Sequence, residues 1–356
     1  MRWFACLAVV LSVAASTAFG WSNKEHIQLT RIAAARLIAD PSTPAEMKQW
    51  LRQAAGELPD MAGEKQYFLT ARVGMYPRGA DGLAWWATVP DLVAGMDRDR
   101  PVTPYGVPER QLHFTDVEFF MPGQGRQVYA DDLSNKPKLT DFPRDMKDPR
   151  WAKAGMLPFR VEDCYKRLVQ CIRDGKLIDT PGQFPRDEHA TKWAGYLAHY
   201  LADSTQPHHS TIDYKSQSYF PGVQRAPNIH SDVEYRLMDD EDNDYPKLRE
   251  EFWVLFVKSL DELKDPIEAT DPWEATLQTQ LISYDGLPLI GQAARAAYLD
   301  KEGKVGKWNP DAFFAFKGKY QGKEMTMSEL KARQMAWAVK RIERVLRSAW
   351  DEAKAK

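Results

Sequence analysis

Histidines and carboxylates recur along this chain at spacings that suit metal binding. His199 precedes Asp203 by four residues, and His230 precedes Glu234 by the same step. Because side chains four residues apart lie on one face of a helix, about 6 Å between their Cβ atoms, each pair can hold one cation. Zinc prefers imidazole nitrogen and carboxylate oxygen, and a catalytic zinc commonly has three protein ligands and a water. Three more of the seven histidines belong to the same pattern: His26, His113 and His209.

A further ligand depends on where the mature chain begins. Residues 1–20 contain one arginine, an apolar run and a small-residue end, which is typical of a secretory signal peptide cleaved after Gly20. The apolar run is short for a membrane span of about 20 residues. Cleavage would leave Trp21 as the first residue, with a free amine whose pKa of about 8 leaves enough neutral form to bind a metal beside His26. We therefore expect an exported protein, periplasmic or extracellular.

The charge of the expected mature chain is close to neutral. Loss of Arg2 leaves 47 basic against 50 acidic residues, a formal net charge of −3. This balance offers no basic surface for tight binding to phosphates, so an anionic substrate would have to be held locally, as metal ions can do. We find no internal repeat and no long flexible linker, and expect residues 21–356 to form one catalytic domain.

Helical periodicity dominates the sequence, and alternating strand patterns are nearly absent, so the expected fold class is all-α. Pro207 should end the central helix, because proline cannot continue its backbone hydrogen bonds. Residues 119–158 are polar and contain five prolines, which predicts a long surface loop with at most a short helix. The expected helices span residues 24–39, 44–55, 160–174, 188–203, 233–263, 286–299 and 326–353.

Two of these helices carry further expectations. Cys164 and Cys171 lie seven positions apart on one helix, about 10 Å, which is too far for a disulfide between them, so we expect small core residues. The last helix repeats apolar residues on one side and is expected to be a core helix rather than a membrane binder. No segment after residue 20 is apolar enough to cross a bilayer, so no stable membrane span is expected.

One string of residues resembles a known family. The H-x3-D-x2-QP-x-H string that begins at His199, with Trp21 upstream and His230 downstream, is similar to the trinuclear-zinc family of bacterial phospholipases C and single-strand-specific nucleases. The resemblance runs in complete order from Trp21 to Glu234, and residues after about 240 match by helical character alone. It implies a single multi-helix all-α domain of the zinc phospholipase C and nuclease type, with three Zn²⁺ ions.

The resemblance also implies which residues bind each ion, giving ten metal-binding roles to nine residues. One zinc would take Trp21, through its amine and carbonyl oxygen, with His26 and Asp203. The second zinc would take Asp91, His113, His199 and the same Asp203, which bridges the pair. The remaining zinc would take His209, His230 and Glu234.

Several alternatives to these ligands stay open. Asp91 lies 22 residues before His113, a longer step than the family pattern leads us to expect, so other carboxylates compete with it: Asp97, Asp99 and Asp116. His189 and His208 are left outside the centre, and each is expected to be solvated or locally hydrogen-bonded. Manganese or iron also suits mixed nitrogen and oxygen ligation.

The implied activity is that of a zinc-dependent phosphoric-ester hydrolase, a phosphodiesterase. Two cations that share a carboxylate can lower the pKa of a bridging water, and the resulting hydroxide attacks phosphorus in line while the third cation stabilises the leaving oxygen. As a ligand of the second zinc, Asp91 would also be within reach to accept the proton of the attacking water, as a general base does.

The spacing of the motifs favours two different substrates. Trp21-x4-His26 and the 21-residue step from His209 to His230 are closer to the nuclease pattern, whereas His-Ser-x-x-Glu ending at Glu234 is closer to the phospholipase pattern. We favour a nuclease or nucleotidase acting on single-stranded nucleic acid or nucleotides. The alternatives are a phospholipase C acting on phosphatidylcholine-like lipids and an exported zinc-binding protein without catalytic activity.

Two aromatic groups could contact either substrate. They could stack a nucleobase, touch an acyl interface, or simply anchor loops by packing. The first group is Tyr214, Tyr219 and Phe220, and the second is Phe313, Phe314, Phe316 and Tyr320.

Overall fold

The structure is a computed structural model that describes residues 21–70, 82–96, 101–102, 105–121, 133–178, 188–238 and 245–355. The expected signal peptide and two of the competing aspartates, Asp97 and Asp99, lie outside these residues. Helices predominate in the described residues, and the fold class is all-α, as expected. None of the described helices is both long and apolar enough to cross a membrane.

The α-helices of the described residues, in chain order, are α1 (Asn23–Ala39), α2 (Ala45–Ala55), α3 (Met61–Leu69), α4 (Gly82–Trp86), α5 (Val89–Met96), α6 (Trp151–Ala154), α7 (Leu157–Arg173), α8 (Ala190–Ser204), α9 (Ile229–Tyr235), α10 (Pro246–Glu262), α11 (Pro272–Tyr284), α12 (Leu287–Tyr298), α13 (Pro310–Phe314) and α14 (Met327–Lys354). The 3₁₀ helices are η1 (Glu109–Leu112), η2 (Val117–Phe120), η3 (Leu139–Asp141), η4 (Pro207–Ser210) and η5 (Gln217–Tyr219). Two antiparallel strand pairs accompany them: β1 (Pro101–Val102) with β2 (Val107–Pro108), and β3 (Lys317–Tyr320) with β4 (Lys323–Thr326).

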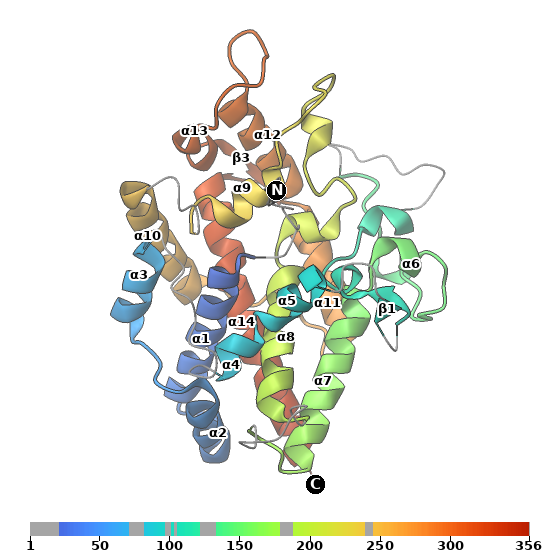
Figure 1. Cartoon of the computed structure of the whole chain (residues 1–356), viewed down its shortest axis with the longest axis vertical. Coiled ribbons are helices and arrows are strands. Elements are labelled where there is room, and N and C mark those ends of the chain that lie inside the picture. Colours follow the sequence, from blue (N-terminus) through green and yellow to red (C-terminus); the bar gives the residue numbers. More distant parts are fainter. Residues whose placement is uncertain are drawn as a thin grey trace, which may run out of the picture.

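The long C-terminal helix α14 runs through the middle of the fold and packs against α1, α7, α8 and α10 (Figure 1). A capping box fixes its start: the Thr326 side chain accepts from the Glu329 N–H, and the Glu329 carboxylate accepts from the Thr326 N–H. The expectation of a core helix is confirmed, because its apolar stripe is buried. The stripe comprises Leu330, Met335, Ala336, Val339, Ile342, Val345, Leu346 and Trp350.

Several sequence expectations are confirmed in the helices around α14. The central helix α8 ends at Ser204, and Pro207 opens the short helix η4, as its missing N–H requires. Cys164 and Cys171 are both buried in α7 and form no disulfide. The expectation that both cysteines are core residues is therefore confirmed.

One expected helix was wrong, and several were missed, namely α3, α4, α5, α11 and α13. The expected helix 233–263 is two helices, because α9 ends at Tyr235 and α10 begins at Pro246, whose ring is tolerated only in a first turn. Helix α11 was not expected, since polar side chains on its buried face hide the apolar periodicity. Its buried polar residues are Thr276, Thr279, Gln280 and Ser283.

The segment 119–158 differs from the expected surface loop. Its described part contains η3 and α6, and α7 already begins at Leu157. The Trp151 indole is fully buried, and its ring centroid lies 4.5 Å from that of Phe120 and 6.3 Å from that of Trp273. A few aromatic side chains thus anchor a polar segment to the core, which composition alone conceals.

A glycine on α8 allows α4 to pack closely against it. A Cβ atom at Gly195 would lie 2.3 Å from the Trp86 Cβ and 2.8 Å from the Leu83 carbonyl oxygen. Only a residue without a side chain fits this approach. Since α5 follows α4 after two residues and carries Asp91, Gly195 sets how near that carboxylate comes to α8.

We predict that Gly195→Ala destabilises the protein. Alanine in place of glycine raises the stability of an open helix site by about 0.5–1 kcal/mol. Here the added methyl overpacks the contact with Trp86, and the free energy of unfolding should fall by about 1–3 kcal/mol in a urea titration. Gly306→Ala is the control, because its added Cβ would meet only Tyr298 oxygen at 3.6 Å. Equal stabilities of the two variants would contradict the close approach.

Candidate metal centre

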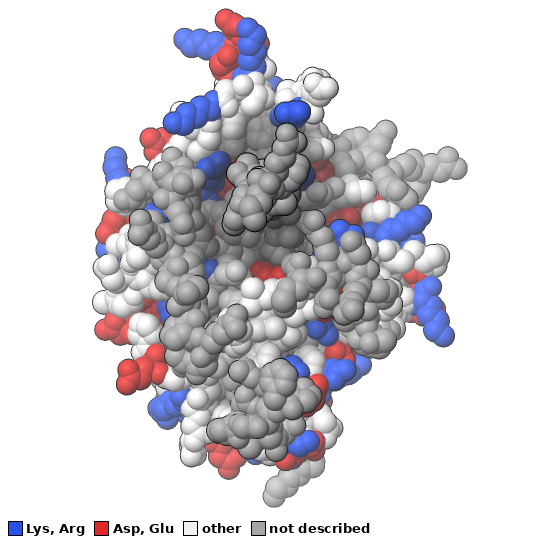
Figure 2. Space-filling view, in the orientation of Figure 1, with Lys and Arg blue, Asp and Glu red and all other residues white. Residues whose placement is uncertain are grey.

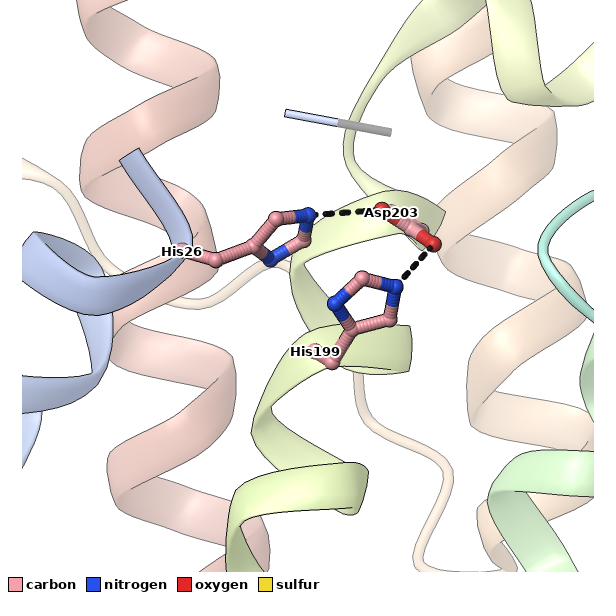
Figure 3. Close-up of side chains that lie close together, drawn as sticks. All are labelled: His26, His199 and Asp203. Carbon is pink, nitrogen blue, oxygen red and sulfur yellow. Dashed lines mark ion pairs between the residues drawn. The ribbon is translucent and has the colours of Figure 1, made fainter. Parts of the chain in front are cut away.

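Helices α1 and α8 bring the first three candidate ligands together. A capping box starts α1: the Ser22 side chain accepts from the Glu25 N–H, and the Glu25 carboxylate accepts from the Ser22 N–H. His26 follows in the first turn, while His199 and Asp203 lie one turn apart on α8. Figure 3 shows both histidines pointing at the Asp203 carboxylate from different sides.

The two oxygens of Asp203 face different histidines. Oδ1 lies 3.3 Å from His26 Nε2, whereas Oδ2 lies 3.2 Å from His199 Nε2 and 3.1 Å from His113 Nδ1. All four side chains are buried. A carboxylate that presents one oxygen to each of two histidine groups has the geometry needed to bridge two cations.

Asp91 lies beside the second pair of histidines. Its Oδ1 is 3.6 Å from both His113 Nδ1 and His199 Nε2, and these two nitrogens are 3.0 Å apart. Asp91 comes from the first turn of α5, and His113 caps the C-terminal end of η1. Of the competing aspartates, Asp116 belongs to none of the metal-compatible groups among the described residues.

The third group lies where η4 meets α9. His209 Nε2 is 3.2 Å from His230 Nε2 and 3.6 Å from Glu234 Oε1, and His230 also pairs directly with Glu234. Gln206 donates to the same Glu234 oxygen at 2.9 Å, which orients the carboxylate. The i, i+4 spacing in α9 therefore brings its two side chains together, as the sequence predicted.

The described residues thus contain three buried groups that could hold metal ions. They are His26, His199 and Asp203; Asp91, His113 and His199; and His209, His230 and Glu234. His199 takes part in two of them, and its ring stacks on that of His26 with centroids 3.9 Å apart, an arrangement that the sequence did not predict.

Trp21 is anchored next to the first group. Its indole is fully buried and donates to the Ala202 carbonyl at 2.9 Å, one residue before Asp203. The side chain of the expected first residue therefore packs on the end of α8. This places the start of the described chain beside Asp203.

Unsatisfied buried atoms show that the groups fit divalent cations. His26 Nε2, Asp91 Oδ1, Asp203 Oδ1 and Glu234 Oε2 are buried and have no hydrogen-bond partner. Leaving such atoms unpaired is costly unless a cation binds them. Two ligand atoms on one tetrahedral zinc lie about 3.3 Å apart, and the distances given above, 3.0 to 3.6 Å, bracket this value.

Backbone carbonyls orient two of the imidazoles. His199 Nδ1 donates to the Ala87 carbonyl at 2.8 Å, and His209 Nδ1 donates to the His113 carbonyl at 2.6 Å. Because a carbonyl only accepts, each Nδ1 carries the proton and each Nε2 is directed at its group.

Burial and neighbouring charges shift the protonation of the centre. Burial lowers the pKa of His26 to about 3, so its imidazole is neutral, and burial raises the pKa of Asp91 to about 8. Burial opposes the charge of His199, but the Asp203 and Asp91 carboxylates outweigh it and raise the pKa to about 9. Burial would raise the pKa of Asp203, yet His199 and His209 hold it well below its usual range.

His189 and His208 were expected to be solvated or locally hydrogen-bonded. Solvation is wrong for both, since each is about 1% exposed. The local hydrogen bonds are present: His189 Nδ1 accepts from the Lys192 N–H at 3.2 Å and caps α8, and His208 Nε2 lies 2.9 Å from Ser216 Oγ. Neither belongs to the three groups.

The aromatic residues divide into anchors and one exposed ring. Tyr214 is 40% exposed, its ring centroid lies 6.1 Å from that of His230, and the Lys215 ammonium lies 5.2 Å from the Tyr214 centroid. The buried members of the two aromatic groups pack in the core and anchor their loops there; they are Tyr219, Phe220, Phe313, Phe314 and Tyr320. Phe316 is half-buried.

No family model and no curated protein matches this chain. The geometry of the three groups is what bears on function.

We predict that metal binding releases protons at pH 7. In the metal-free protein Asp91, with a pKa of about 8, and His199, with a pKa of about 9, are both protonated at this pH. Burial also raises the pKa of Glu234 well above its usual range. Since only the deprotonated groups bind a cation, zinc should displace at least about two protons per molecule, and its affinity should rise as the pH rises toward 9. Calorimetric titrations in two buffers of different ionisation enthalpy measure this count.

Asp91→Asn is the matched variant for the proton count. It removes one titrating group, so the release should fall by about one proton. A binding heat that does not depend on the buffer would contradict the assigned protonation.

Proposed function

We propose that the protein is a zinc-dependent phosphoric-ester hydrolase, a phosphodiesterase with a three-metal centre. The observation that carries this proposal is the bridging position of Asp203, whose two oxygens face different histidine groups. A buried bridging carboxylate flanked by a further aspartate and a second His–Glu group suits the two- and three-cation chemistry of phosphoester cleavage.

The chain offers ligands for each ion in this proposal. His26, Asp203 and the amine and carbonyl of Trp21 would hold the first ion, which requires cleavage after Gly20. Asp91, His113 and His199 would hold the second with Asp203. The third would take His209, His230 and Glu234, the group formed at η4 and α9.

Bound zinc would supply Lewis acidity, which lowers the pKa of water and offsets the negative charge on phosphate oxygens. The chain's own residues complete the chemistry. Asp91 Oδ1 lies 3.6 Å from both His113 Nδ1 and His199 Nε2, so its carboxylate, deprotonated when a cation binds, would be placed to accept the proton of the attacking water as a general base. The Ala87 and His113 carbonyls keep His199 and His209 in one tautomer and orientation.

We propose nucleic acid or nucleotides as the substrate class. The exposed Tyr214 ring beside His230 offers a face for stacking a nucleobase, and Lys215 adds a positive charge next to it. On the face of the molecule that Figure 2 shows, the described Lys and Arg side chains are interspersed with Asp and Glu and form no single basic field. Affinity for phosphate would then come from the metals rather than from a basic surface.

A panel of substrates tests the proposal. The mature protein, with its zinc content measured, is assayed on single-stranded DNA, RNA, a 3′-nucleotide and phosphatidylcholine micelles, with and without chelator. Chelator-sensitive hydrolysis of nucleic acid or nucleotide supports the proposal. Hydrolysis of the lipid alone would favour phospholipase C, which the Glu234 motif resembles, and bound zinc without any hydrolysis would favour a non-catalytic zinc-binding protein.

We predict that Asp203→Asn abolishes activity without unfolding the helices. The substitution removes the bridging charge and keeps the side-chain volume, so activity should fall at least about 100-fold. The far-ultraviolet circular dichroism of the variant should stay close to that of the wild type. Full activity in a folded Asp203→Asn protein would show that the bridge assignment is wrong.

We predict that Tyr214→Ala weakens nucleic-acid substrates specifically. Loss of one stacked base should raise KM about 10-fold or more on single-stranded DNA. Zinc content should not change, since Tyr214 is not a proposed ligand. Tyr214→Phe keeps the ring and should retain the KM of the wild type, so an unchanged KM in Tyr214→Ala would exclude this residue from substrate binding.

A further inference from the structure

Lys331, in the second turn of α14, is a fully buried lysine close to the candidate metal centre. Burial of an ammonium group costs free energy unless the group is paired, so the contacts of Lys331 indicate which segments it stabilises. It forms an ion pair with Glu25 Oε1 at 2.6 Å, donates to the Val233 carbonyl, and lies 5.3 Å from the centroid of the Trp21 ring. Each contact is to a segment that carries proposed ligands.

The contact with Glu25 reaches the start of α1. Glu25 precedes His26 in the chain, and its other oxygen accepts from the Ser22 N–H at 2.9 Å in the capping box. Lys331 therefore stabilises the N-terminal cap of α1, and this cap fixes the orientation of the first helical turn, which carries His26. The Lys331 ammonium also contacts the ring of Trp21.

The contact with Val233 reaches the third group. Val233 lies between His230 and Glu234 in α9, a helix of seven residues. The last carbonyls of a helix lack intrahelical partners, and a cation there also suits the helix dipole. Lys331 thus joins the last turn of α9 to the start of α1.

A second buried lysine repeats this connection. Lys24 Nζ donates to the carbonyls of Phe68 at 3.2 Å, of Met238 at 3.1 Å and of Thr70. Met238 follows α9 by three residues, so both buried ammonium groups link the beginning of α1 to the α9 region.

We propose that Lys331 is a positioning residue that holds the segment Trp21–His26 and helix α9 together, and so couples the ligands proposed for the first ion to those proposed for the third. The inference rests on the proposed metal centre. None of the Lys331 contacts given above involves Asp91, His113 or His199. Loss of Lys331 should therefore affect the first and third ions and spare the second.

The test compares Lys331→Met with Arg341→Met in the mature, zinc-loaded protein. Arg341 is a matched control: it lies ten residues further along α14, about 15 Å away, is about 1% exposed, and pairs with Asp265 at 3.1 Å. Zinc content is measured after dialysis against a competing chelator. Carbethoxylation of each histidine is mapped by mass spectrometry.

The expected result is specific to two of the three groups. Lys331→Met should bind the first and third ions about 10- to 100-fold more weakly, as loss of a ligand-orienting partner does, and should retain close to one zinc. His26, His209 and His230 should become reactive, while His113 and His199 stay protected. Arg341→Met should keep its zinc and the protection of all five histidines, even if its unfolding midpoint falls.

A double variant separates positioning from stability. The double variant Lys331→Met, Glu25→Gln removes both charges of the buried ion pair, so neither is left unpaired. The glutamine oxygen can still accept the hydrogen bond from the Ser22 N–H. The unfolding midpoint should therefore recover. Zinc content should stay low if Lys331 acts by position. The proposal would be overturned if the double variant bound three zinc ions again as its stability recovered. It would also be overturned if Lys331→Met lost zinc equally from all three sites.

The readouts do not depend on hydrolysis. Wild-type protein that binds three ions but cleaves no phosphoester would refute the proposed activity and leave the role of Lys331 standing. Wild-type protein that binds no zinc would overturn both.

Discussion

Burial of the Asp203 carboxylate is the constraint on which the rest of the structure depends. A carboxylate removed from water is stable only if opposite charges or donors surround it. Three histidines from α1, α8 and the end of η1 lie within 3.3 Å of its two oxygens. The packing of α1 and α8 against α14, and of η1 against α5 and α7, keeps such a cluster in place.

Much of the centre could be predicted from local spacing, because helix geometry is short-range. The i, i+4 pairs of α8 and α9 are as close as the helical repeat requires. The association of His113 and Asp91 with α8 is different, since it depends on tertiary contacts such as the approach of α4 at Gly195. No spacing along the chain encodes that approach, and only the family resemblance assigned these two residues to one ion.

The parts of the fold that were not predicted share one cause, which is burial of polar or mixed segments. Helix α11 hides its periodicity behind buried Thr and Gln side chains, and Trp151 anchors a segment that reads as a polar loop. Lys331 belongs to the same class, because a lysine in an amphipathic helix is ordinarily assigned to the surface. The burial of these side chains is explained by their contacts, and the residues that they contact lie far away in the sequence.

Anomalous diffraction from crystals of the mature, zinc-loaded protein, measured at the zinc absorption edge, tests the central claim most directly. We expect three peaks: two on opposite sides of Asp203, reached by His26 and by His113 with His199, and a third between His209, His230 and Glu234. Absence of a peak on either side of Asp203, or zinc bound only elsewhere, would contradict it.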